Sequence, residues 1–342
     1  MSRHLQDLTN RAFGQNRRLV VPLLGFPGVA MCGTTIKVAQ QNVNTHVRVL
    51  ETLYREFKPD ALFPLMDLSV EANALGRYVD FPVNDSATVS PRDFDFEDLN
   101  QLSAVELDGD GRVWAYVETV RKMRSQLPKD VLMGAYVTGP YTLAALINGA
   151  EKTALATLTK PHDLQQLCEL ATNKISRLMT QLLSAGAEMI CILEPTAMML
   201  GPNEFETFSA RYLRQLVSVC QNRNIPAILH ICGDTRHLIP SIAATGVDAM
   251  SLDSPANGIH LPAILEQVEP SMVLIGNVDP VREMVQGTAE SVRKAVQTLM
   301  DALKENPNFI LSTGCDIPLE APLENIHAFM SAGRQLIRSG SD

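Results

Sequence analysis

Eight short apolar runs, separated by longer segments of helical periodicity, are the feature that most constrains the fold of this chain. The runs lack regular alternation with polar residues, which is typical of strands buried on both faces in a parallel sheet covered by helices. The predicted strands are 19–24, 61–65, 131–137, 189–193, 227–231, 248–252, 273–275 and 309–311.

The segments between these runs predict helices. The clearest places apolar residues from Leu164 to Leu182 on one stripe and ends at Gly186, a typical C-terminal cap. The other predicted helices are 40–57, 112–127, 204–222, 235–244, 262–268, 289–305 and 322–338.

Strands that alternate with helices predict an α/β fold, either a (β/α)8 TIM barrel or a doubly wound sheet. No G-x-G-x-x-G motif follows the first strand, which weakens the doubly wound alternative. No linker or repeat divides the chain. We therefore expect a single barrel domain over residues 1–342, with an N-terminal helical extension before the first strand.

Charge and cysteine content exclude several classes of partner. Lys and Arg number 29 and Asp and Glu 38, a net charge of −9, which argues against nucleic acid. Six cysteines are too few for a disulfide framework, so we expect reduced thiols and a cytoplasmic protein. The uncharged stretches 19–36 and 131–150 are interrupted by Pro and Gly, so no membrane span is expected.

In a barrel, the C-terminal ends of the strands carry the chemistry, and these ends are rich in metal-binding groups. His230 and Cys232 are two apart on an extended segment, so both point to one side. Cys315 follows the last strand, whose end faces the same mouth. One imidazole and two thiolates favour zinc, and three ligands leave a position open for substrate. The alternative is two small buried thiols beside a hydrogen-bonded core histidine.

Six segments resemble the uroporphyrinogen decarboxylase superfamily, and within it the zinc-dependent corrinoid-protein methyltransferases of the methylcobalamin:coenzyme M type. These segments are 65–76 (LMDLSVEANALG), 138–146 (TGPYTLAAL), 193–196 (LEPT), 229–234 (LHICGD), 275–280 (IGNVDP) and 312–315 (STGC). The resemblance implies a barrel with zinc bound by His230, Cys232 and Cys315. It also implies methyl transfer from methylcobalamin on a partner corrinoid protein to a small thiol such as coenzyme M.

The departures from the family pattern bear on the substrate. Uroporphyrinogen decarboxylases have an Arg-rich signature after the first strand, whereas 25–33 reads GFPGVAMCG. They also tend to have His where this chain has Cys315. Without guanidinium partners for its carboxylates, uroporphyrinogen is disfavoured as the substrate. A decarboxylase and a non-catalytic zinc-bound scaffold that docks a corrinoid protein remain as alternatives.

Further strand-end residues receive predicted roles. Glu194 and Asp253 are candidates for the fourth zinc position or for accepting the thiol proton. Asp67 and Glu71 are expected to shape the mouth or contact substrate. For all four, the alternative is a structural role such as capping the next helix. Among the glycines of the first loop, Gly28 and Gly33 are expected to allow close approach of the corrin ring or to permit a moving lid, and ordinary turn geometry is the alternative.

Overall fold

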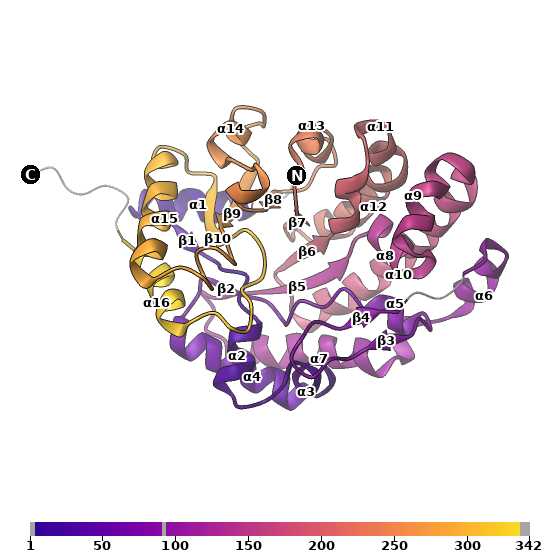
Figure 1. Ribbon diagram of the computed structural model, residues 1–342, viewed down its shortest axis with the longest axis horizontal. Coiled ribbons are helices and arrows are strands. Elements are labelled where there is room, and N and C mark those ends of the chain that lie inside the picture. The colour runs from indigo at the N-terminus through magenta and orange to yellow at the C-terminus, as the bar shows by residue number, and fades with distance from the viewer. Residues whose placement is uncertain (1–3, 91–93, 336–342) are drawn as a thin grey trace, which may run out of the picture.

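The computed structural model describes residues 4–90 and 94–335 and has the predicted (β/α)8 architecture. Eight parallel strands lie side by side in the order β1-β10-β9-β8-β7-β6-β5-β2, and helices surround them (Figure 1). The strands are β1 (Leu19–Val20), β2 (Ala61–Leu62), β5 (Leu132–Thr138), β6 (Met189–Leu193), β7 (Ala227–Ile231), β8 (Ala249–Leu252), β9 (Val273–Val278) and β10 (Phe309–Thr313).

Asp60 joins β1 to β2, the two strands that complete the barrel. Its backbone N–H donates to the carbonyl of Val20 at 3.1 Å, and its carboxylate accepts from the N–H of Val20 at 2.7 Å. Both strands are shorter than the predicted 19–24 and 61–65. Beyond the strands, the N–H of Leu23 donates to Thr313 and that of Leu65 to His46, so side chains satisfy these backbone groups in place of a strand partner.

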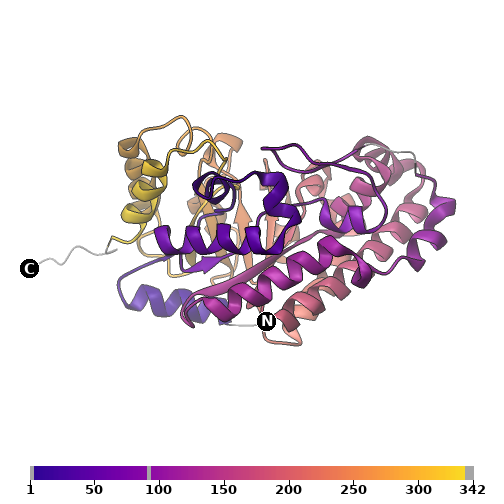
Figure 2. The ribbon, with the colours of Figure 1, turned by 90° about the horizontal axis from the view of Figure 1, so that it is seen from below.

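Helices occupy all the predicted helical segments, with shifted bounds, and further helices that were not predicted lie at 26–31, 70–74, 99–104, 140–148 and 150–159. The helices are α1 (His4–Gly14), α2 (Phe26–Met31), α3 (Ile36–Gln41), α4 (Val43–Phe57), α5 (Val70–Ala74), α6 (Leu99–Ala104), α7 (Gly111–Gln126), α8 (Pro140–Asn148), α9 (Ala150–Thr159), α10 (Pro161–Ala185), α11 (Pro202–Phe205), α12 (Arg211–Gln221), α13 (Ile239–Ala243), α14 (Leu261–Leu265), α15 (Ala289–Ala302) and α16 (Leu323–Gly333). Figure 2 shows α4, α7 and α10, which contact one another in turn, along one flank.

Two predicted helices are divided in the structure. Segment 40–57 is split at Asn42, because its side chain caps α4 by accepting from the N–H of Thr45. In 204–222, a π-helical turn over Glu206–Ala210 separates α11 from α12. The end of the predicted helix 322–338 lies beyond residue 335, outside the described residues. None of the helices that the structure describes is long and apolar enough to cross a membrane.

The expected N-terminal helical extension is α1, and it covers the end of the barrel opposite the strand C-termini. Leu5 is fully buried within the cluster of apolar side chains that fills the barrel. It lines a small apolar cavity with Leu19, Ala61 and Met189, all at strand starts. The other face of the sheet packs against the helices in a second, larger cluster. With one end of the barrel covered by α1, the strand C-termini form the open end that positions a site.

An antiparallel hairpin of β3 (Val79–Asp80) and β4 (Thr88–Val89) interrupts the alternation of strands and helices after β2. It was not predicted from the sequence. Each strand has two residues, too few to show a period of two.

Gly28 lies in α2, against α4, and not in an open loop. A Cβ atom there would lie 2.5 Å from a side-chain carbon of Leu53 and 2.9 Å from one of Val49. The close approach that this glycine permits in the structure is therefore between two helices.

Replacement of Gly28 by Ala is expected to lower the free energy of unfolding by about 1–3 kcal/mol, because the added methyl overpacks the α2–α4 contact. Urea denaturation measures the change. Gly111→Ala, where nothing lies within 4 Å of the added atom, is the control and should not destabilise the protein. Unchanged stability of Gly28→Ala would contradict the packing role.

Candidate metal centre

His230, Cys232 and Cys315 meet at the C-terminal end of the barrel. His230 is the penultimate residue of β7, Cys232 directly follows that strand, and Cys315 lies two residues after β10. The distance from His230 Nε2 to Cys232 Sγ is 3.0 Å, between the two sulfurs 3.5 Å, and from Cys315 Sγ to His230 Nε2 3.8 Å. They form the one such group of metal-binding His, Cys, Asp or Glu side chains found among the described residues.

The triangle of ligand atoms fits a tetrahedral zinc ion. Zinc bonds near 2.3 Å to sulfur and near 2.0 Å to nitrogen place two sulfurs about 3.8 Å apart and a sulfur and a nitrogen about 3.6 Å apart. The distance of 3.5 Å between the sulfurs and that of 3.8 Å from Cys315 Sγ to His230 Nε2 lie within about 0.3 Å of these values, whereas the 3.0 Å from His230 Nε2 to Cys232 Sγ is about 0.6 Å shorter. The set leaves one tetrahedral position without a protein ligand.

Ser251 orients the imidazole. It lies opposite His230 in the β7–β8 ladder, and its hydroxyl is 2.9 Å from His230 Nδ1. That contact leaves Nε2 directed at the two sulfurs. Partners of this kind fix the orientation of a metal-binding imidazole.

Gly314 permits the approach of Cys315 to the rest of the group. A Cβ atom at this residue would lie 2.6 Å from the backbone nitrogen of Ser254 and 3.0 Å from the carbonyl carbon of Asp253. The chain after β10 therefore passes directly over the end of β8. A side chain at residue 314 would force these two segments apart and displace the neighbouring Cys315.

The two thiols have opposite pKa shifts. The pKa of Cys315 is lowered because the Cys232 thiol and then His230 hydrogen-bond to its sulfur. The pKa of Cys232 is raised, first by the same bond to Cys315 and then by burial. Binding a cation to both sulfurs requires both thiols to be deprotonated, so it releases protons.

Asp253 lies beside the group but binds backbone. One of its carboxylate oxygens accepts from the N–H of Gly233 at 2.7 Å, and the other accepts from the N–H of Ser254 at 2.6 Å. It thereby holds the turn that follows Cys232. The expectation that Asp253 completes the zinc site or accepts the thiol proton stays a prediction.

Glu194 is fully buried at the start of α8. Its carboxylate accepts from the backbone N–H groups of Tyr141 and Thr142 and from the hydroxyl of Ser209, at 2.8–2.9 Å. Burial raises the pKa of Glu194, and these donors oppose the shift. The geometry matches the alternative of a helix-capping carboxylate. A role for Glu194 in binding zinc or accepting a proton also stays a prediction.

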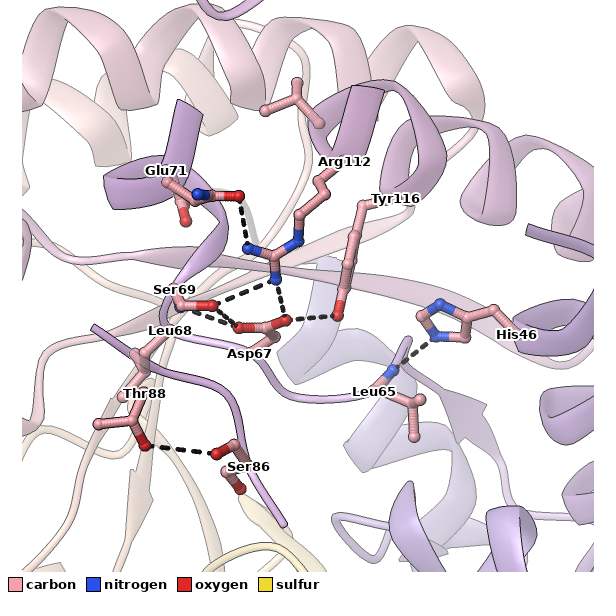
Figure 3. A network of polar contacts seen from close by, with 12 residues as sticks. His46, Leu65, Asp67, Leu68, Ser69, Glu71, Ser86, Thr88, Arg112 and Tyr116 are labelled. Atoms are coloured by element: carbon pink, nitrogen blue, oxygen red, sulfur yellow. Dashed lines mark hydrogen bonds and ion pairs between the residues drawn. The ribbon is translucent and has the colours of Figure 1, made fainter. Parts of the chain in front are cut away.

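Asp67 and Glu71 are buried in a polar network after β2 (Figure 3). Asp67 accepts from Arg112, Tyr116 and Ser69. Glu71 accepts from the backbone N–H and the hydroxyl of Thr138, and burial raises its pKa. Both carboxylates therefore connect elements on this side of the barrel.

A pocket of about 460 Å³ opens beside Cys315, a size suited to a small molecule. Asp67 and Asp316 line it, together with apolar side chains such as Phe26 and Leu319. Residues 84–87, at the tip of the unpredicted hairpin, form one wall. Loops after β1, β2 and β10 thus contribute to the mouth.

Gly33 lies in a turn of the first loop. Gly33 has a φ of +58° and nothing within 4 Å of an added Cβ, which is the geometry of a turn.

Two residues of the site, Ser251 and Arg112, were not predicted from the sequence. Ser251 precedes Asp253 by two residues, the spacing that also places His230 and Cys232 on one side, so this signal was available. Arg112 has no comparable signal, since it lies 45 residues from Asp67.

The chain is similar to known proteins over most of its length. The sequence model for uroporphyrinogen decarboxylase (URO-D) matches residues 28–336. A methylcobamide:CoM methyltransferase, MtbA, of Methanosarcina mazei is 26% identical over 241 residues, 70% of this chain and 68% of that protein. A uroporphyrinogen decarboxylase of Prochlorococcus marinus is 26% identical over 295 residues, 83% and 80% of the two chains. A solved methyltransferase structure from Methanosarcina mazei superposes with a TM-score of 0.83 at 20% identity and covers 93% of each chain.

Replacement of the ligands tests the metal centre. His230→Ala, Cys232→Ser and Cys315→Ser are each expected to lose most bound zinc and to stay folded, because an open three-ligand site does not hold a barrel together. Elemental analysis and circular dichroism measure the two properties. Cys168→Ser and Cys220→Ser, in α10 and α12, are the controls and should keep zinc. Unfolding of the protein on chelation would identify a structural site.

Ser251→Ala removes the partner of His230 Nδ1 without touching a ligand. We expect zinc affinity to fall by about 10- to 100-fold, the usual effect of losing such a partner. Competition with a chromophoric chelator measures the affinity. Ser254→Ala, in the following loop, is the control. Equal affinity of Ser251→Ala and the unaltered protein would mean that the packing around the imidazole suffices to orient it.

Proposed function

The chain belongs to the uroporphyrinogen decarboxylase family, and from this premise we propose that it is a zinc-dependent methyltransferase. It transfers a methyl group from methylcobalamin, carried by a corrinoid protein, to a small thiol. In the overall reaction a sulfur–carbon bond forms and the cobalt–carbon bond breaks, with its electron pair left on cobalt and the thiol proton released. The name of the relative MtbA supports this donor and suggests coenzyme M as one acceptor.

The observation that carries the proposal is the open group of one imidazole and two thiols beside a pocket. Cys315 belongs to both the group and the pocket. The sulfur of a thiol bound in the pocket would therefore lie next to the three side chains and could take the fourth tetrahedral position. A bound zinc ion supplies positive charge that keeps a coordinated thiol deprotonated at neutral pH. A purely structural site has four protein ligands, whereas the described residues bring three together.

The chain's own residues position the reactants. Ser251 holds the imidazole, Asp253 holds the turn after Cys232, and Gly314 lets Cys315 reach them. The apolar side chains of Phe26 and Leu319 exclude water from part of the pocket. Holding a thiol sulfur in line with the methyl carbon makes a bimolecular reaction effectively unimolecular, which lowers its activation free energy. We propose the same positioning role for Glu194, Asp67 and Glu71, since backbone or side-chain donors occupy each carboxylate.

The pocket disfavours the decarboxylase alternative. Uroporphyrinogen carries several carboxylates, which require Arg or Lys partners. The described residues that line the pocket include neither, and the first loop, 25–33, has no Arg. Arg112, at the edge of the site, already pairs with Asp67. The charges of this site therefore favour methyl transfer to a small molecule over decarboxylation of a polyanion.

The zinc-loaded protein is expected to methylate a small thiol with free methylcobalamin, followed by the loss of the methylcobalamin absorbance and by mass spectrometry of the thioether. Cys315→Ser should be at least 100-fold slower, because a ligand is lost, while Cys220→Ser should retain the rate. Full zinc occupancy with no thioether from any thiol tested would favour the corrinoid-docking scaffold. Cobalamin consumption without metal would contradict the zinc mechanism.

A further inference from the structure

The pocket beside Cys315 has an unusual charge distribution. Four of its lining residues are acidic, namely Asp67, Asp85, Asp316 and Glu320. Within the described part of the chain, no Lys, Arg or His side chain lines it. A small molecule bound there would face acidic side chains and no basic side chain of the described pocket lining. The pocket therefore favours a molecule that carries positive charge over one that carries negative charge.

Arg112 is a cation in contact with one member of this acidic group, Asp67. Its guanidinium pairs with Asp67 and also donates to Asn73 and Ser69. Its side chain is 12% exposed, and the ring of Phe81 lies 4.7 Å from the guanidinium carbon. Figure 3 shows the guanidinium directed into this network. Arg112 therefore balances the charge of Asp67 and leaves the other three carboxylates unpaired by it.

Asp316 directly follows the ligand Cys315 and has an incomplete set of contacts. Burial raises the pKa of Asp316 well above its usual range, and hydrogen bonds from the backbone N–H groups of Gly25 and Ile317 to its carboxylate oppose that shift. Its second oxygen, Oδ2, is fully buried and has no hydrogen-bond partner in the described structure. A buried carboxylate oxygen without a donor is costly, and such atoms in folded proteins are usually satisfied by a ligand or water. Since Asp316 lines the pocket, a molecule bound there can supply the missing donor.

We propose that the acceptor is a thiol with a positively charged, hydrogen-bond-donating tail, an aminothiol, and that Asp316 selects it. This inference rests on the proposed methyl transfer and narrows its substrate class. The ammonium group donates to Asp316 Oδ2, while the sulfur lies at the group of three ligands that includes the adjacent Cys315. Thiols with anionic tails, including coenzyme M with its sulfonate, are disfavoured by the same carboxylates.

Three thiols with the same two-carbon chain test the inference: 2-aminoethanethiol, 2-mercaptoethanol and 2-mercaptoethanesulfonate. Their tails are cationic, neutral and anionic. With zinc-loaded protein and free methylcobalamin, we expect kcat/KM to fall in that order, with at least a tenfold difference between the first and the last. Methylation of none of the three would overturn the proposed function itself. Methylation that favours the sulfonate would overturn only the aminothiol inference.

Asp316→Asn separates the effect of the pocket from the intrinsic reactivity of the thiols. The ratio of kcat/KM for the cationic thiol to that for the anionic thiol should fall at least tenfold in this variant, at one fixed pH. Asp7→Asn makes the same chemical change on α1, at the opposite end of the barrel, and should keep the ratio of the unaltered protein. An unchanged ratio in Asp316→Asn would overturn the inference.

Binding of the two product thioethers gives a second readout that does not depend on the variant or on turnover. The methyl thioethers of 2-aminoethanethiol and 2-mercaptoethanesulfonate have no thiol proton, so their affinities for the unaltered protein report the effect of the tail. Calorimetry should give tighter binding of the amine by at least tenfold. Equal binding, or tighter binding of the sulfonate, would overturn the inference even if Asp316→Asn fails to fold or to retain zinc.

Discussion

The site depends on how closely the chain after β10 passes over the end of β8. Gly314 makes that passage possible, since a Cβ atom there would lie 2.6 Å from the backbone of Ser254. The passage places Cys315 within 3.5 Å of Cys232, although 83 residues separate them in the sequence. His230 and Cys232, two residues apart in the sequence, provide two of the three candidate ligands, and the closed barrel brings the third. The barrel is therefore what assembles the candidate metal centre.

Buried carboxylates hold the loops around this centre. Glu194 binds the start of α8, Asp253 binds the turns after β7 and β8, and Asp67 and Glu71 tie the segment after β2 to α7 and β5. Each is a carboxyl group that gains hydrogen bonds in exchange for lost hydration. Loops anchored in this way hold the ligands and the pocket in place, and they leave Asp316 as a carboxylate with an unpartnered oxygen.

Sequence reasoning predicted the eight strands and the grouping of His230, Cys232 and Cys315, because burial on both faces and a spacing of two leave clear patterns. It did not predict where β1 and β2 end, since contacts of Leu23 and Leu65 with distant side chains determine those ends. The ion pair of Asp67 with Arg112 was equally hidden, because only the folded chain brings these residues together. Strand-end acids looked alike in the sequence, whether they bind backbone, as Glu194 does, or line a pocket, as Asp316 does.

X-ray absorption spectroscopy at the zinc edge tests the central claim most directly. For the purified protein the account predicts a coordination sphere with one imidazole nitrogen, two sulfurs and one exchangeable light atom. Addition of 2-aminoethanethiol should convert this sphere to one nitrogen and three sulfurs. A sphere of four protein ligands that does not change when the thiol is added, or a protein that binds no zinc, would contradict the account.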